Sequence, residues 1–133
     1  MVDRDTLIQL AAQVREHAYA PYSSFKVGAA LLSDDGCVHL GCNVENAAYG
    51  PSNCAERTAL HRAIADGVKP GTFLAIAVIG DTPRPITPCG VCRQVLSELC
   101  SPEMPVYMAN LQGEVQMMKV AELLPGAFSL PTG

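Results

Sequence analysis

Three cysteines in two separate motifs limit most strongly what this chain can fold into. Cys54 begins the sequence Cys-Ala-Glu, and it lies 35 residues before Cys89 of the sequence Pro-Cys-Gly-Val-Cys, which ends at Cys92. Two cysteines three residues apart can place both sulfurs on one metal ion, although Cys-x-x-Cys alone is also typical of a redox pair. A third cysteine that opens a predicted helix of its own favours the metal. The fold must then bring the starts of two helices together.

The ligand type indicates zinc. Thiolates are soft ligands that suit zinc, and three protein ligands leave the fourth tetrahedral position for water. The positive end of a helix also favours thiolate over thiol. The alternative is a closed, structural site with a fourth ligand from Cys37, Cys42 or Cys100. These three cysteines stand singly in apolar or strand-like surroundings, and we expect each to be a small buried residue.

Glu56 helps to decide whether the predicted zinc site is catalytic or structural. Residues i and i+2 point in different directions on a regular helix, so Glu56 can share a site with Cys54 only if Cys54 lies at the helix entrance. A carboxylate beside a metal-held water can take its proton and pass it to a substrate. Three thiolates on one Zn²⁺ leave negative charge, which calls for a cation nearby. Arg57 faces Cys54 along the helix and is expected to donate to its sulfur, and Arg93 is a second candidate.

Helical and strand-like periodicities alternate along the chain. We expect helices from Asp3 to about Tyr19, and over Ala55–Ala65, Gly90–Leu99 and Val120–Leu124. We expect strands over Phe25–Leu32, Cys37–Val44, Phe73–Ile79, Val106–Ala109 and Val115–Met118. This order predicts an α/β fold with one central, partly parallel sheet, in a single domain over residues 1–133.

The composition limits the class of substrate and the cellular compartment that we expect. The net charge is −4, from nine Lys and Arg against thirteen Asp and Glu, and no basic cluster occurs. Binding to a nucleic-acid backbone relies on such a cluster, so we expect a small uncharged substrate and no nucleic acid. No apolar run reaches the roughly 18–20 residues of a membrane span, so no membrane partner is expected. The start, MVDRDTLIQL, does not resemble a signal peptide, which predicts a cytoplasmic protein.

Several motifs in order resemble the cytidine deaminase family, in particular its small homotetrameric, zinc-dependent branch. The first cysteine motif with its glutamate and the Pro-Cys-x-x-Cys motif are the general signature of zinc deaminases. The matching segments are Ala20–Ser23, Phe25–Ala30, Gly41–Ala47, Cys54–Ala59, Pro88–Gln94 and Glu122–Phe128. The resemblance implies a three-layer α/β/α fold with one mixed sheet of about five strands flanked by helices. It also implies one Zn²⁺ per subunit on Cys54, Cys89 and Cys92, and hydrolysis of cytidine and 2'-deoxycytidine to uridine and 2'-deoxyuridine plus ammonia in pyrimidine salvage, with Glu56 moving the protons.

The resemblance also assigns substrate contacts. Asn43 and Glu45 resemble the ribose-binding pair, because alternate positions at a strand end point the same way and both side chains can bind sugar hydroxyls. Phe25 resembles the aromatic wall for the base, and Ala55 is similar to the position whose backbone contacts the pyrimidine edge. Phe128 resembles a residue donated across the interface of a homotetramer whose sites are shared between subunits.

Other functions remain open at this point. The nearest is a deaminase of another aminopyrimidine nucleoside such as blasticidin S, against which the segment from Asn43 to Ala47 argues. A polynucleotide-editing deaminase is disfavoured by the acidic balance. A non-catalytic zinc module would use the cysteines only to pin two helices together, and a thiol redox protein would use Cys89 and Cys92 alone. Tyr49 is a further candidate for the subunit interface.

Overall fold

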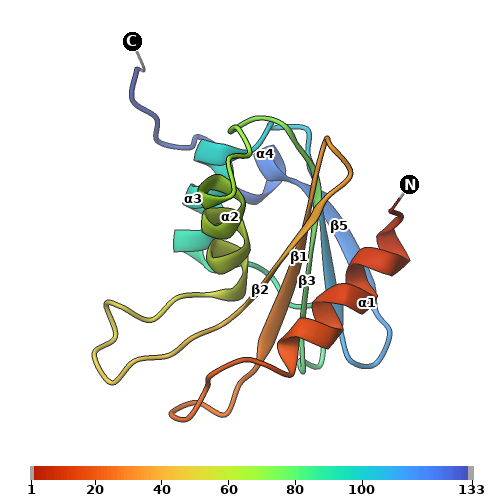
Figure 1. The fold of residues 1–133 in the computed structure, drawn as a ribbon, viewed down its shortest axis with the longest axis vertical. Coiled ribbons are helices and arrows are strands. Elements are labelled where there is room, and N and C mark those ends of the chain that lie inside the picture. The colour runs from red at the N-terminus through yellow and green to blue at the C-terminus, as the bar shows by residue number, and fades with distance from the viewer. Residues whose placement is uncertain (1, 132–133) are drawn as a thin grey trace.

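A five-stranded sheet lies between helices in the computed structural model, which describes residues 2–131 (Figure 1). In chain order the elements are α1 (Arg4–Arg15), β1 (Val27–Ser33), β2 (Val38–Cys42), α2 (Ala55–Ala65), β3 (Phe73–Gly80), α3 (Gly90–Leu99), β4 (Pro105–Asn110), β5 (Val115–Lys119) and α4 (Val120–Leu123). No helix within this part of the chain is both long enough and apolar enough to cross a bilayer.

The sheet is mixed, with the strand order β2-β1-β3-β4-β5. β3 and β4 run parallel, and the pairs β1–β2, β1–β3 and β4–β5 are antiparallel. All residues of β1 are buried, as expected for a strand covered on both faces, whereas edge strand β5 is largely exposed. The predicted mixed sheet of about five strands is confirmed.

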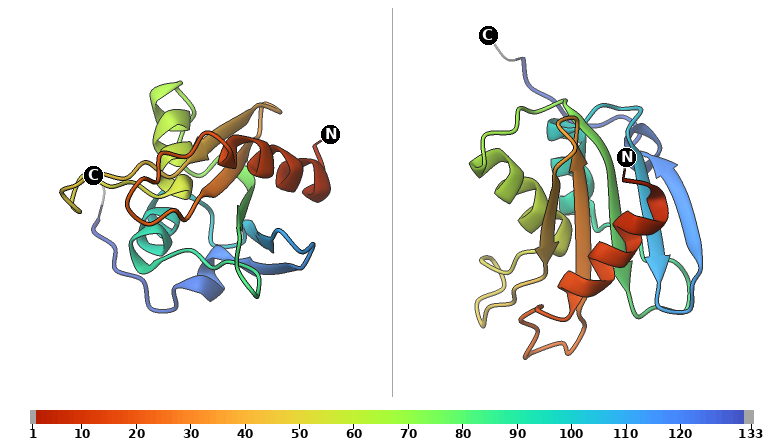
Figure 2. Two further views of the ribbon diagram at one scale, coloured as in Figure 1. Left: turned by 90° about the horizontal axis from the view of Figure 1, so that it is seen from below. Right: turned by 45° about the vertical axis from the view of Figure 1, so that its right-hand side comes forward.

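The helices divide between the two faces of the sheet, which gives the three predicted layers. α1 crosses one face, and α2 and α3 lie side by side on the other (Figures 1 and 2). Successive residues of β1 serve opposite faces: Ala30 packs in the cluster that contains Leu7 of α1, and Leu31 packs in the cluster that contains Leu60 of α2. The predicted three-layer α/β/α arrangement is therefore confirmed.

A glycine in β2 brings the start of α2 against the sheet. A Cβ atom on Gly41 would overlap the carbonyl oxygen of Ala55 and the backbone nitrogen of Ala59. Only glycine allows this approach, which fixes the first turn of α2 over the sheet. Because Cys54 and Glu56 flank Ala55, the same contact sets their height above β2.

Several predicted boundaries are wrong at the end of the molecule where the loops gather. The first helix ends at Arg15, before Tyr19, because the chain is extended at Tyr19 and pairs with Val44. The strand predicted from Phe25 begins at Val27, after Ser24 turns the chain with a φ of 58°. The prediction of a buried Cys37 is also wrong.

Cys37 is exposed because it lies in the turn between β1 and β2 and outside the strand expected to bury it. Cys42 is half-buried, and Cys100 is buried as predicted.

Candidate metal centre and active site

The two cysteine motifs converge where α2 and α3 begin. Cys54 and Cys89 are the N-cap residues of the two helices, and Cys92 lies buried in the first turn of α3. Their three sulfurs all lie within 4.8 Å of one another, and the Sγ atoms of Cys54 and Cys89 are 3.7 Å apart. A tetrahedral ion with Zn–S bonds of about 2.3 Å would separate two sulfurs by about 3.8 Å. The spacing therefore fits zinc.

Cys54 and Cys89 have extended backbones, which explains how the site is assembled. Cys54 has φ −75° and ψ 159°, and Cys89 has φ −69° and ψ 169°. Cys54 thus stands outside the helix, so the directional conflict between positions i and i+2 does not arise for Glu56. Neither cysteine side chain makes a cap hydrogen bond, so both sulfurs are free to face each other.

Arg57 supplies the expected cation. Its Nη2 atom donates to the Sγ atom of Cys54 at 3.3 Å, and its buried Nε atom has no partner within residues 2–131. Hydrogen bonds from Cys92, Arg57 and Cys89 lower the pKa of Cys54 to about 5. The pKa of Cys92 is raised, because its thiol donates to the sulfur of Cys54. A partly buried guanidinium that donates to a thiolate suits a cluster that carries negative charge, as three thiolates on one zinc ion do.

The cluster that could hold a metal ion has three members in the described part of the chain. Among the described residues, the group of side chains close enough to share a metal consists of Cys54, Cys89 and Cys92. A closed site completed by Cys37, Cys42 or Cys100 is therefore wrong. Three protein ligands are the number typical of a catalytic zinc site, which keeps one position open.

Glu56 is buried next to the sulfurs. Its side chain is 5% exposed, and burial raises its pKa to about 7. A carboxyl group with this pKa exists in both protonation states near neutral pH, as a group that accepts and then returns a proton requires. A glutamate that only stabilised the first turn of α2 through the helix dipole would be expected in solvent, so this burial favours a role beside the sulfurs.

A cavity of about 180 Å³ opens beside these groups. Its lining consists of Phe25, Val27, Asn43, Cys54, Ala55, Glu56, Ile86, Thr87 and Cys89. The structure thus brings Phe25, Asn43 and Ala55 together with the metal site. Sequence reasoning missed Val27, Ile86 and Thr87. Their signal was only their place in the chain, since Thr87 directly precedes the Pro-Cys motif and Val27 follows Phe25 by two residues.

Asn43 and Glu45 differ in their surroundings. The Asn43 side chain accepts from Val27 N at 2.8 Å and donates from Nδ2 to Phe25 O at 2.7 Å, which holds its amide at the cavity wall. Glu45 does not line the cavity. Its carboxylate accepts from the backbone nitrogens of Tyr22 and Ser23 and from the Ser23 hydroxyl, and the hydroxyl contact above all lowers its pKa.

The remaining candidates lie outside this cavity. Phe128 and Tyr49 are 67% and 90% exposed. The Arg93 guanidinium donates to two backbone carbonyls, those of Pro88 and Leu123. Of the two candidate arginines, Arg57 donates to a cysteine sulfur, whereas Arg93 donates to backbone carbonyl oxygens.

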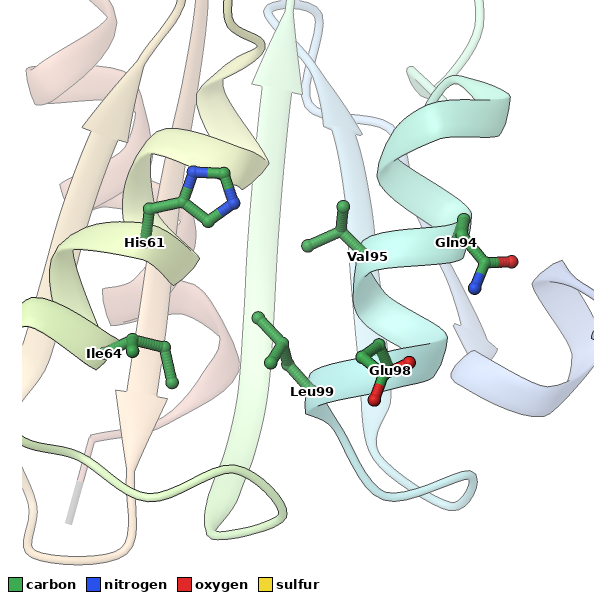
Figure 3. Close-up of a pocket in the computed structure, with 6 residues that line it drawn as sticks. All are labelled: His61, Ile64, Gln94, Val95, Glu98 and Leu99. Carbon is green, nitrogen blue, oxygen red and sulfur yellow. The ribbon is translucent and has the colours of Figure 1, made fainter. Parts of the chain in front are cut away.

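A second hollow, of about 540 Å³, lies between α2 and α3 on the outer face of the molecule. His61 and Ile64 from α2 face Val95 and Leu99 from α3 across it, with Gln94 and Glu98 at its rim (Figure 3). Its lining contains none of the three cysteines and does not contain Glu56. The smaller cavity, which Cys54, Cys89 and Glu56 line, is therefore the candidate active site.

Comparison with known proteins agrees with this assignment. The family model described as the cytidine and deoxycytidylate deaminase zinc-binding region matches residues 1–108. The chain is 54% identical to the cytidine deaminase of Sporosarcina psychrophila, covering 96% of this chain and 93% of that one, and 57% identical to that of Halalkalibacterium halodurans, covering 96% of each. A crystal structure of cytidine deaminase from Burkholderia pseudomallei superposes with a TM-score of 0.93 at 57% identity, covering 95% of this chain and 99% of that chain. For the Mycobacterium tuberculosis enzyme the TM-score is 0.82 at 39% identity, with 98% and 100% covered. The three-cysteine centre with its buried glutamate thus stands in a chain that belongs to the cytidine and deoxycytidylate deaminase family.

Proposed function

We propose that this protein hydrolyses cytidine and 2'-deoxycytidine to uridine and 2'-deoxyuridine with release of ammonia. The observation that carries this proposal is a three-sulfur metal centre beside a buried carboxyl group at the wall of a small cavity. The full-length similarity to proteins named cytidine deaminase supports the same reaction.

Cys54, Cys89 and Cys92 would hold one zinc ion per subunit. When bound, zinc supplies a Lewis acid that makes a water molecule more acidic at neutral pH. Arg57 offsets part of the negative charge of the three thiolates through its contact with Cys54. Without that cation the sulfurs would weaken the acidifying effect.

Glu56 moves the protons. It takes a proton from the attacking water and delivers it to N3 of the cytosine ring, which makes C4 a better electrophile. The water oxygen bonds to C4, Glu56 transfers the second water proton to the exocyclic amino group, and the C4–N bond breaks as ammonia leaves. One water is consumed for each ammonia released, and one carboxyl group near the required pKa suffices for all transfers.

The cavity suits a flat aminopyrimidine. Phe25 provides an aromatic side chain at its wall, and the backbone of Ala55 lies where a ring edge can be bound. The Nδ2 atom of Asn43 has a second hydrogen beyond the one given to Phe25, and we assign it to the sugar. Glu45, which does not line the cavity, is assigned to the same sugar through the 3'-hydroxyl, which both nucleosides carry.

Exposed apolar side chains support an assembly in which copies share their sites. Phe128, Tyr49 and Val91 are all more than half exposed, and Val91 lies between two metal ligands in sequence. Burial of such side chains against a second copy would stabilise an oligomer. We assign a homotetramer to the protein, with Phe128 directed to a neighbouring site, and we place it in the cytoplasm, in pyrimidine salvage.

Zinc stoichiometry and nucleoside turnover test the proposal together. Purified protein should hold one zinc per chain and convert cytidine, followed by its ultraviolet absorbance. Zinc binding without turnover of cytidine or 2'-deoxycytidine would instead favour a non-catalytic module or another aminopyrimidine substrate such as blasticidin S. Absence of zinc after supplementation would overturn the proposal altogether.

A further inference from the structure

Arg93 connects two parts of the chain that are distant in sequence. From α3, its Nε atom donates to Pro88 O at 2.8 Å and its Nη1 atom donates to Leu123 O at 3.0 Å. The side chain is half-buried, and no carboxylate within residues 2–131 forms an ion pair with it. A partly buried guanidinium that donates to two neutral carbonyl oxygens, and forms no ion pair with any residue that the structure describes, indicates a role in positioning the backbone at Pro88 and Leu123.

The first contact fixes the backbone on both sides of Cys89. Pro88 is fully buried, and its carbonyl precedes the helix, so it has no partner within the helical ladder. The peptide between Pro88 and Cys89 is planar, so holding its oxygen also sets the start of Cys89. In addition, the backbone nitrogen of Arg93 donates to Cys89 O at 2.9 Å. Arg93 therefore holds both peptide groups that flank an exposed metal ligand.

The second contact holds the C-terminal segment. Leu123 ends the four-residue helix α4, which is too short to be stable by itself. The next residue of α3 makes a similar contact, because Gln94 Nε2 donates to Phe128 O at 3.1 Å. Since the Phe128 side chain is mostly exposed, main-chain bonds of this kind place it.

We propose that Arg93 is a positioning residue that couples the geometry of the Cys89 sulfur to the placement of the segment from Leu123 to Phe128, with Gln94 as a second anchor of that segment. The inference rests on the proposed function, in which Cys89 holds zinc and Phe128 reaches a neighbouring site. Loosening the segment then disturbs the metal ligand, and loosening the ligand loop frees the segment.

Arg93→Met tests both halves of this coupling, because it keeps the aliphatic stem and removes both hydrogen bonds. Zinc release into an excess of chromophoric chelator should be about 10–100-fold faster, the usual effect of losing a residue that supports a metal ligand. Carboxypeptidase digestion followed by mass spectrometry should show faster trimming into the segment from Leu123 to Phe128. Arg93→Lys keeps the charge but not the fork of donors, so it should fall between the wild type and Arg93→Met.

Two further variants separate the possible causes. Arg84→Met removes the same charge from an exposed position in the loop before Pro88, and it should release zinc like the wild type. Gln94→Ala removes the second anchor of the segment, so it should speed trimming, raise KM through Phe128 and, through the coupling, speed zinc release by less than Arg93→Met does.

Zinc release by Arg93→Met within twofold of the wild type would overturn the inference, and so would an equal acceleration in Arg84→Met. Faster zinc release with unchanged trimming would refute the coupling itself. If Arg93→Met does not fold, Arg93→Lys decides the question, and wild-type rates in both assays count against the inference. A wild-type protein that holds no zinc would instead overturn the proposed function.

Discussion

The two faces of the sheet are covered by helices that begin in different ways. On one face, α1 begins with Asp3, whose carboxylate accepts a hydrogen bond from Thr6 N at 2.8 Å. On the other face, α2 and α3 begin with Cys54 and Cys89, which make no side-chain cap bond. A side-chain hydrogen bond from the N-cap residue stabilises a helix, and a cysteine at this position does not provide that stabilisation. The comparison indicates that the α1 face serves stability, whereas the α2–α3 face leaves helix starts free for chemistry.

The same contrast appears in what each face buries. The α1 side packs aliphatic side chains such as Leu7, Ala11 and Ile79. The other side also has an aliphatic core, but it buries Glu56 and leaves the Nε atom of Arg57 without a partner among residues 2–131. Buried polar groups of this kind cost stability, and a catalytic centre is where such a cost is commonly found. Variants on the two faces should therefore change different quantities.

The largest effect is expected for Glu56→Gln on the α2–α3 face. The amide keeps the shape of the side chain but cannot accept and return protons, so kcat should fall by about 10²–10⁴-fold. Zinc content and the unfolding midpoint should stay close to wild type, as measured by metal analysis and thermal denaturation. Asp5→Asn in the exposed first turn of α1 removes the same charge and should leave kcat unchanged. Near-normal turnover by Glu56→Gln would remove Glu56 from its role.

Leu7→Ala makes the corresponding change on the α1 face. Leu7 is 1% exposed within the core between α1 and the sheet. Truncation should lower the free energy of unfolding by about 2–5 kcal/mol, because a cavity is left in packed surroundings. Denaturant unfolding at one fixed protein concentration measures this change. Below the transition, zinc content and kcat should match the wild type; a selective loss of zinc would show that the faces are not independent.

Much of this contrast could be predicted from the sequence, because both cysteine helices have strong local signals. The bounds of α2 and α3 match the prediction residue for residue, since Asp66-Gly67 ends the first and Pro88-Cys89 precedes the second. The end of α1 was missed because Tyr19 pairs with Val44, a contact distant in sequence. The sequence likewise gives no local signal that Ile86 lines the cavity, because the path of the loop between β3 and α3 places it there.

Arg57→Met should have an intermediate effect on the α2–α3 face. The change removes the hydrogen bond to Cys54 and the positive charge beside the thiolates. Zinc affinity should drop by about 10–100-fold, measured by competition with a chelator. Arg62→Met, on the same helix but exposed, is the matched control and should bind zinc normally. Equal losses in both variants would mean that general charge, and not the contact with Cys54, supports the metal.

The smallest effect is expected from Asp3→Ala, which removes the cap of α1. The hydrogen bond from Thr6 N holds the pKa of Asp3 below its ordinary value of 3.8. A lowered pKa in the folded state means that the carboxylate stabilises the protein above that ordinary value, and that this contribution is lost as the pH falls through the folded-state pKa. The melting temperature of Asp3→Ala should therefore lie slightly below that of the wild type at pH 7, and the difference should shrink only as the pH falls below 3.8. Asp3→Asn keeps an equally good cap without titrating, so its difference from Asp3→Ala should persist with pH. A gap between wild type and Asp3→Ala that does not change with pH would show that the hydrogen-bonded carboxylate is not what stabilises the start of α1, and the contrast between capped and cysteine-led helices would lose its energetic basis.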